Sequence, residues 1–267
     1  MIYYIVLALM LLFITYMRFE ASWVEVNHIK FTKSSKNLKI LHISDLHTNR
    51  LKVPWQKIRK IIKKENPDLI LITGDCIEKE QHMDIFLDFI DYLDFDQPVY
   101  MCLGNHDHRA FSYNRKKVNK FIREIEKRRI TVLDNCSVCF NKNKKNYSIT
   151  GIDDIREGSP DIEKALSTKK ENAYINIAIS HNPDIVYSLK GKEIHYLFCG
   201  HLHGGQIWAP FNLEFRLLRG DKLGLNGIKK GLHRINGINL YISRGLGNVT
   251  VPLRFRSRPE ITIYYLP

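Results

Sequence analysis

Cysteine is scarce in this 267-residue sequence: there are five cysteines and only one CxxC motif. An odd number of cysteines spread through apolar stretches argues against a disulfide framework. The CxxC at Cys136 and Cys139 has no second pair to complete a zinc site, and we interpret it as two thiols on a strand-rich segment. A chain of this length can bury a core without a structural metal, so any metal here is expected to serve function.

Acidic residues are few, with 28 Asp and Glu against 41 Lys and Arg, which gives a formal net charge of +13. This balance suits a polyanionic partner, although many solvated basic faces would give the same number. No stretch alternates aromatic and basic residues as an RNA-binding strand does, so nucleic acid is the less favoured partner. We expect an anionic membrane lipid surface and a phosphorylated or pyrophosphate-containing substrate as partners.

Charge is also missing from residues 2–17, which are slightly shorter than the roughly 20 residues of an ideal membrane span. Phe19 can extend this run. A cleaved signal peptide is the alternative, but it would need a basic start and a small-residue cleavage site. No Lys or Arg precedes the run, and several follow it: Arg18, Lys30, Lys33, Lys36 and Lys39. The positive-inside rule therefore predicts a single-pass anchor in the cell membrane, with the body on the cytoplasmic face.

The rest of the chain predicts an α/β fold in two parts. Strand patterns at 23–32, 37–44, 68–73 and 98–103 alternate with helix patterns at 54–65, 82–95 and 114–129. Short strands then follow with few helices, at 130–135, 136–141, 146–152, 173–180, 194–200, 239–245 and 260–266. We interpret this half as a second sheet facing the first, with a hairpin tip at 141–146. The expected division is an anchor at 1–19, a juxtamembrane strand and connection at 20–36, and one catalytic domain at 37–267.

Polar residues collect where the predicted strands end. Five successive strand ends carry Asp45 and His47, then Asp75, then Asn105 with His106, Asp107 and His108, then His181, and finally His201 and His203. Each group alone has an ordinary structural explanation, such as a turn or a buried histidine. Together they place carboxylate, amide and imidazole groups where ligands of open α/β sheets bind, outside the carboxyl ends of strands.

The chemistry of these side chains indicates a metal centre. Histidine, carboxylate and amide ligands without thiolate suit Mn, Fe or Zn. Seven such groups are too many for one ion but fit two. Two ions bridged by a carboxylate can polarise a phosphoryl oxygen and activate the attacking water. The sequence therefore predicts metal-assisted hydrolysis of a phosphoester.

The blocks D-x-H, GD, GNH[DE], a later H and GHxH occur in this order between Asp45 and His203. In this they resemble the signature of calcineurin-like metallophosphoesterases. "GHLHGGQ" and "YISRGLG…PLRFRSRPEI" are similar to a bacterial branch of membrane-associated phosphodiesterases and UDP-2,3-diacylglucosamine pyrophosphatase-like enzymes. The resemblance covers nearly everything after the anchor. It implies a four-layer αββα sandwich of two facing mixed sheets flanked by helices.

The resemblance also implies roles for the matching residues. Asp45, His47 and His203 would bind one metal, Asn105, His181 and His201 the other, and Asp75 both. His106 would contact the phosphate and protonate the leaving oxygen, with Asp107 orienting it. His108 has no implied role. His42 lies inside a strand and is expected to be a satisfied core histidine.

Two later features are expected to extend the site. Gly204 and Gly205 lack a Cβ and could let a substrate approach closely. Arg244 could bind phosphate through its guanidinium, and an ion pair within the second sheet is the alternative. Three further arginines could meet an anionic bilayer or form a solvated basic edge: Arg254, Arg256 and Arg258.

The predicted function is a two-metal phosphoesterase acting on a membrane-associated substrate, such as a UDP-diacylglucosamine-like lipid. A nuclease or a cyclic-nucleotide phosphodiesterase with the same metals is the first alternative. A non-catalytic membrane scaffold of the same fold is the second, and the intact ligands and His106 argue against it.

Overall fold

The computed structural model describes residues 1–34, 37–169 and 172–267. Lys36 and the predicted boundary after it lie outside the described residues. The helices are α1 (Ile2–Glu20), α2 (Trp55–Glu65), α3 (Met83–Leu93), α4 (Asn105–Ala110), α5 (Arg115–Glu126), α6 (Ile162–Ser167) and α7 (Lys222–Leu225). Shorter helical turns are η1 (Thr48–Arg50), η2 (Glu80–His82), η3 (Pro183–Tyr187), η4 (Pro210–Asn212) and η5 (Phe215–Arg219).

Twelve strands of the described chain form two six-stranded sheets. The first sheet has the order β1 (Glu25–Lys30), β12 (Glu260–Leu266), β2 (Leu38–Ile43), β3 (Leu69–Thr73), β4 (Val99–Cys102), β5 (Ile130–Val132). The second has the order β10 (Gly231–Ile235), β11 (Ile238–Ile242), β9 (Tyr196–Cys199), β8 (Ile175–Ile179), β7 (Lys145–Gly151), β6 (Cys136–Lys142). Both sheets contain parallel and antiparallel pairs, which confirms the prediction of two mixed sheets.

Two strands were assigned to the wrong sheet by the sequence pattern. β5 pairs in parallel with β4, because α5 carries the chain over the sheet in a crossover and returns it beside the preceding strand. β12 lies between β1 and β2, antiparallel to β2, so the end of the chain completes the first sheet. Local alternation of side chains contains no information about which distant strand is the neighbour.

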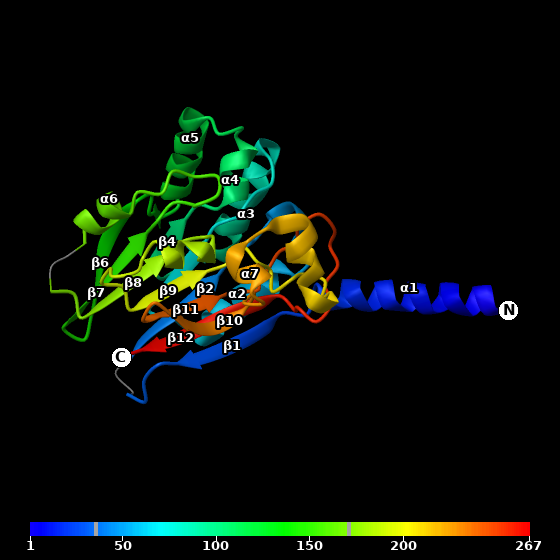
Figure 1. Cartoon of the computed structure of the whole chain (residues 1–267). Coiled ribbons are helices and arrows are strands. Elements are labelled where there is room, and N and C mark those ends of the chain that lie inside the picture. Colours follow the sequence, from blue (N-terminus) through cyan, green and yellow to red (C-terminus); the bar gives the residue numbers. More distant parts are fainter. Residues whose placement is uncertain (35–36, 170–171) are drawn as a thin grey trace.

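Apolar side chains fill three layers, which separate four layers of backbone (Figure 1). In β2, Leu41 and Ile43 pack under α2, α3 and α5, whereas Leu38 and Ile40 point between the sheets. This alternation follows from the two-residue period of a strand that is buried on both faces. The outer face of the second sheet packs against α6, η3 and α7. The observed layers confirm the predicted αββα sandwich.

His42 is a core residue, as the sequence indicated. It is fully buried between the sheets, with Nδ1 2.9 Å from the Tyr264 hydroxyl and Nε2 2.7 Å from Thr73 Oγ1. Burial lowers the pKa of His42 to about 3, so the ring stays neutral. Both ring nitrogens are therefore satisfied without a ligand.

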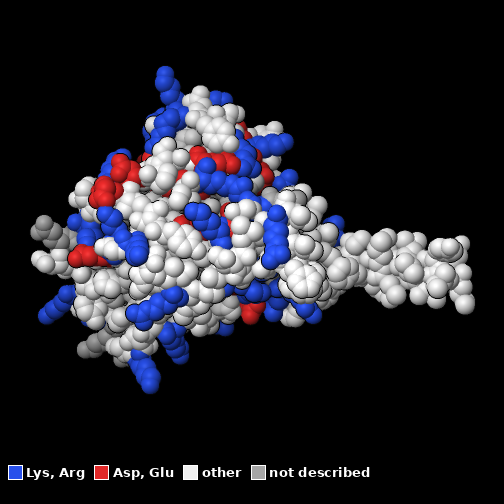
Figure 2. Space-filling view, viewed as in Figure 1, with Lys and Arg blue, Asp and Glu red and all other residues white. Residues whose placement is uncertain are grey.

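Helix α1 projects away from the body (Figure 1). In the described chain it is the one helix long and apolar enough to cross a membrane, and almost none of it is buried. Figure 2 shows no charged side chain along its projecting part. Only its last turns contact the body, where Met17 and Glu20 are buried.

Candidate metal centre

The predicted ligands follow β2, β3, β4, β8 and β9, in loops except for Asn105, which begins α4. Because these strands are parallel to neighbours in their sheets, their carboxyl ends meet at one edge of the sandwich. Five of the ligands have a left-handed backbone with positive φ: Asp45 (50°), His47 (38°), Asp75 (54°), His201 (71°) and His203 (50°). Non-glycine residues adopt this conformation only where the surrounding structure imposes it, and such residues cluster at functional sites.

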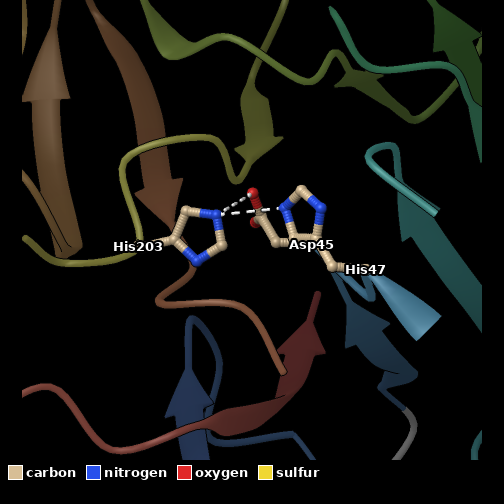
Figure 3. Close-up of side chains that lie close together, drawn as sticks. All are labelled: Asp45, His47 and His203. Atoms are coloured by element: carbon tan, nitrogen blue, oxygen red, sulfur yellow. Dashed lines mark hydrogen bonds and ion pairs between the residues drawn. The ribbon is translucent and has the colours of Figure 1, made fainter. Parts of the chain in front are cut away.

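Asp45, His47 and His203 converge from two sheets into a first cluster (Figure 3). The Nε2 atom of His203 lies 3.2 Å from Asp45 Oδ1 and 3.3 Å from His47 Nε2. All three side chains are buried. Nitrogen ligands lie about 2.0–2.1 Å from zinc, so two that share one ion are roughly 3–3.5 Å apart. The spacing of the two imidazoles fits a shared ion.

Asp75, His181 and His201 form a second buried cluster. His181 Nε2 lies 3.0 Å from Asp75 Oδ2, and His201 Nδ1 lies 3.2 Å from His181 Nε2. Asn105 begins α4 beside Asp75, and its Oδ1 is buried without a hydrogen-bond partner among the described residues. A buried amide oxygen without a donor is costly unless something else binds it. A cation would satisfy it.

The two clusters adjoin at Asp75. Its Oδ2 lies 3.0 Å from His181 Nε2 in the second cluster and 3.7 Å from His47 Nε2 in the first. The structure therefore groups six of the predicted ligands as the resemblance implied, and the seventh, Asn105, lines the same cavity as Asp75 and His201. Their ligand roles stay predictions.

Three of the histidines are oriented from behind by an acceptor. His181 Nδ1 donates to the carbonyl of Thr73 at 2.8 Å, and His201 Nε2 lies 3.0 Å from Asp221 Oδ1. His47 Nδ1 lies 2.7 Å from Glu78 Oε1. In each case the acceptor lies beside the outer nitrogen of the ring, so the inner nitrogen faces the cluster. This arrangement is typical of metal-binding histidines.

The charge of the site also fits cations. Burial lowers the pKa of His201 to about 3 and holds the pKa of His203 well below its usual range, so both rings are neutral and able to bind a metal. Burial alone would lower the pKa of His181 too, but Asp75 and Asp45 outweigh it and raise that pKa to about 10. The two buried carboxylates therefore draw positive charge into the site.

Asp107 does not orient His106, contrary to the prediction. Its carboxylate faces away from that ring and accepts four backbone N–H bonds, from Asp75, Cys76, Ile77 and Gly104 at 2.9–3.1 Å. Asp107 lies three residues after the N-cap of α4, where a carboxylate caps the helix and ties it to the Asp75 loop.

Glu78 is the residue that contacts the His106 imidazole, with Oε2 3.3 Å from Nδ1. Burial opposes protonation of His106, but Asp75 and Glu78 together raise its pKa. Glu78 also contacts His47 and lies 3.3 Å from Arg50 Nη1. One carboxylate thus positions a predicted ligand and the predicted acid.

Gly204, Gly205 and Arg244 do not line the cavity at the metal centre. A Cβ at Gly204 would lie 2.6 Å from Ser257 Oγ and 2.8 Å from the Arg244 side chain, so protein atoms occupy the space predicted for substrate. Both glycines have left-handed φ, which gives them a turn-forming role. Arg244 is held by Glu260 and by Glu25, so it forms an ion pair as in the alternative, but its partners lie on β12 and β1 of the first sheet and not within the second.

Arg254 is fully buried and cannot meet a bilayer. Its guanidinium donates to backbone carbonyls of Arg244, Gly245, Gly247 and Ser257. It stabilises the loop before β12, whose Gly247 N–H donates to the Asp45 carbonyl at 2.7 Å.

Sequence reasoning missed Glu78, Asp221 and Ser257. Glu78 had a signal, because it follows Asp75 by three residues in "GDCIE". Asp221 lies in a segment without a motif. Ser257 Oγ donates to the His203 carbonyl at 2.6 Å, and its N–H donates to Glu20 at 2.9 Å, which links the end of α1 to a predicted ligand. Only the folded chain reveals these contacts.

A cavity of about 630 Å³ opens over the two clusters. Its floor contains Asp75, Asn105, His106, His201 and His203. Three arginines and several apolar side chains form its walls: Arg109, Arg156, Arg219, Ile207, Leu213, Leu217, Val249 and Val251. The cavity thus joins a polar floor to a partly apolar mouth.

Comparison with known proteins identifies similar sequences over most of the chain. The family model described as calcineurin-like phosphoesterase matches residues 38–205. The chain is 30% identical to YkoQ of Bacillus subtilis, an uncharacterized metallophosphoesterase, over 91% of this chain and 90% of that protein. It is 28% identical to the phosphodiesterase YaeI of Escherichia coli, over 92% and 90% respectively.

A further relative carries a more specific name. The chain is 27% identical to the UDP-2,3-diacylglucosamine pyrophosphatase LpxG of Chlamydia muridarum, over 85% of this chain and 82% of that protein. Among solved structures, TT1561 of Thermus thermophilus superposes with a TM-score of 0.50 at 14% identity, covering 79% of this chain and 90% of that one. At that identity the likeness concerns the fold.

Proposed function

This chain belongs to the calcineurin-like phosphoesterase family, and we propose that it hydrolyses a phosphodiester or pyrophosphate bond with two divalent transition-metal ions. Its class, a metal-dependent phosphoesterase, follows from the family and from relatives named as a phosphodiesterase and a pyrophosphatase. The observation that carries the proposal is the pair of buried ligand clusters joined at Asp75. The donor set suits Mn, Fe or Zn.

In this proposal one ion is held by Asp45, His47 and His203, the other by Asn105, His181 and His201, and Asp75 stands between them. When bound, such ions polarise a phosphoryl oxygen and favour ionisation of an attacking water. The protein contributes a buried donor set, in which three of the four histidine rings have an acceptor behind them.

The side chains lining the cavity supply the remaining chemistry. His106 lines the floor, and Glu78 holds its Nδ1, which leaves Nε2 to give a proton to the leaving oxygen. Three arginines are available to bind phosphate oxygens of the substrate: Arg109, Arg156 and Arg219. Arg109 is held by Glu157, and Arg219 by Asp221.

We propose a membrane-associated substrate, such as a UDP-diacylglucosamine-like lipid. The apolar mouth of the cavity above a polar floor suits an amphiphilic molecule. The apolar helix α1 and a relative named as a UDP-2,3-diacylglucosamine pyrophosphatase support the same substrate class. The relative named as a phosphodiesterase makes a phosphodiester the nearest alternative bond.

A substrate panel with purified full-length protein in detergent tests this function. With added Mn, the protein should cleave bis-nitrophenyl phosphate and UDP-diacylglucosamine. A nitrophenyl monoester, a cyclic nucleotide and single-stranded DNA serve as comparisons. Turnover should disappear with a chelator and return with the metal. Failure to cleave every substrate after metal loading would contradict the proposal, and preference for the cyclic nucleotide or DNA would redirect it to those alternatives.

We propose that α1 anchors the chain in the cell membrane with the body on the cytoplasmic face. The composition of α1 and the basic residues that follow it support this placement. Protease added to spheroplasts should leave the body intact and digest it only after lysis. Digestion from outside would place the body on the opposite face.

A further inference from the structure

The mouth of the cavity is surrounded by exposed apolar side chains. We call residues 206–219 and 249–255 the rim. After α1, the two most exposed large apolar side chains of the described chain are Phe211 (79%) and Leu217 (74%), and both belong to the rim. Four more of its apolar side chains are exposed: Ile207, Trp208, Leu213 and Val251. A concentration of this kind around a site entrance marks an interaction surface.

Backbone hydrogen bonds join the two segments of the rim. The N–H of Trp208 donates to the carbonyl of Phe255, and the N–H of Phe255 donates to the carbonyl of Gln206, each at 3.0 Å. The Gln206 side-chain amide donates to three carbonyls of the second segment at 2.9–3.1 Å. The exposed apolar side chains therefore project from two segments that are hydrogen-bonded to each other.

The rim also packs against α1. The ring centroid of Phe255 lies 5.1 Å from that of Phe13 and 6.4 Å from that of Tyr16. The N–H of Arg254 donates to the carbonyl of Met17 at 3.1 Å. Figure 1 shows the segment around η4 and η5 beside the point where α1 leaves the body. These contacts place the rim beside residues 13–17 of α1.

The rim therefore lies beside a part of α1 that is needed if the helix is to cross a bilayer. The 19 residues of α1 extend about 28 Å at about 1.5 Å each, which is close to the roughly 30 Å hydrocarbon core. Phe13 stands about 10 Å before the end of the helix at Glu20. If α1 spans the bilayer, nearly all of it is needed, and Phe255 beside Phe13 must reach the membrane interface.

Arginine and aromatic side chains lie together at this end of the body. The Arg256 guanidinium lies 4.9 Å from the Trp208 ring centroid and 5.6 Å from that of Phe255. The Arg258 guanidinium lies 3.9 Å from the ring centroid of Trp23, just beyond α1. Aromatic rings favour the headgroup level of a bilayer, and cations there attract anionic lipids.

We infer that the rim inserts into the interface of an anionic phospholipid bilayer, so that the cavity opens toward the membrane. The inference rests on the proposed function, because it takes α1 as the membrane span. It deepens that function by giving a phosphate-linked lipid a route from the bilayer to the clusters. The apolar walls of the cavity continue from the rim toward His106 and Asn105 on its floor.

Quenching of tryptophan fluorescence by brominated lipid tests the inference in the full chain. The protein is reconstituted into nanodiscs of equal parts phosphatidylglycerol and phosphatidylcholine. The phosphatidylcholine carries bromine on its acyl chains. Two variants in a Trp208→Phe background, whose own emission from Trp23 and Trp55 is subtracted, each add one tryptophan, Phe211→Trp on the rim or Tyr174→Trp. Tyr174 is an exposed aromatic residue immediately before β8, and the predicted ligand His181 follows the other end of this strand. Tyr174 therefore lies away from the cavity and serves as the matched control. Both positions are exposed, which favours normal folding.

The tryptophan added at position 211 should lose most of its emission, and the one at position 174 should keep it. Restoring Trp208 should also add a quenched component. Equal emission from the two added tryptophans would overturn the inference while leaving the proposed function in place. A chain that does not copurify with nanodiscs would instead refute the membrane span, and the inference with it. Turnover of bis-nitrophenyl phosphate should be unchanged by Phe211→Trp, because this residue lies outside the predicted ligand clusters.

Discussion

Asp75→Asn is expected to abolish phosphoesterase turnover and reduce the metal content from about two ions per chain to one or none. Asp75 lies between the two clusters, and an amide cannot supply the charge that two cations share. Stabilisation of charge by metals contributes several kcal/mol to phosphoryl transfer. Since about 1.4 kcal/mol corresponds to tenfold in rate, turnover should fall by about 10³-fold or more.

Elemental analysis after dialysis and turnover of bis-nitrophenyl phosphate measure the two effects of Asp75→Asn. The replacement keeps the size of the side chain and the Oδ1 atom that accepts from the His106 N–H at 2.8 Å, so the fold should survive. Asp134→Asn is the matched control, because Asp134 is a carboxylate paired with Arg115 away from the clusters. Two bound ions and undiminished turnover in Asp75→Asn would refute the bridging role.

His106→Asn is expected to keep both ions and lose turnover by about 10²–10⁴-fold, the range that a general acid contributes. His106 lines the cavity and groups with His47 and Glu78, outside the two clusters that adjoin at Asp75. The same two measurements apply. His28→Gln is the control, since His28 is a partly exposed histidine on β1. Unchanged turnover in His106→Asn would remove this residue from the reaction.

Asp107→Asn separates positioning of the acid from support of the loops. The Asp107 carboxylate uses both oxygens to accept four backbone N–H bonds, and an amide offers only one oxygen. The variant should therefore melt at a lower temperature and lose metal along with turnover. If Asp107→Asn instead kept its metal and stability and lost only turnover, the original prediction that Asp107 orients His106 would be restored.

The sequence alone was enough to locate the candidate site, for a physical reason. A strand buried on both faces is visible as a short apolar run, and polar residues directly after it must stand at the carboxyl edge of the sheet. Asp45, Asp75 and His181 follow this rule. The spacing of two in His201 and His203 then allowed one loop to reach both clusters, and the structure places the two rings in different clusters.

The partners of these residues could not be predicted, because they come from distant parts of the chain. Arg244 was expected to bind phosphate, yet β1 and β12 bring Glu25 and Glu260 to its guanidinium. His106 was expected to pair with its neighbour Asp107. Instead the start of α4 turns that carboxylate toward backbone N–H groups and leaves Glu78 against the ring.

By itself the sequence determined the α/β layers, the apolar helix and the seven convergent polar side chains, since each depends on local periodicity or on where a strand ends. Tertiary structure alone decided the places of β5 and β12, the buried position of Arg254 and the packing of the rim against α1. These features depend on pairings between residues far apart in the chain. Such pairings are selected by the shape and charge of the folded molecule, and local sequence patterns do not encode them.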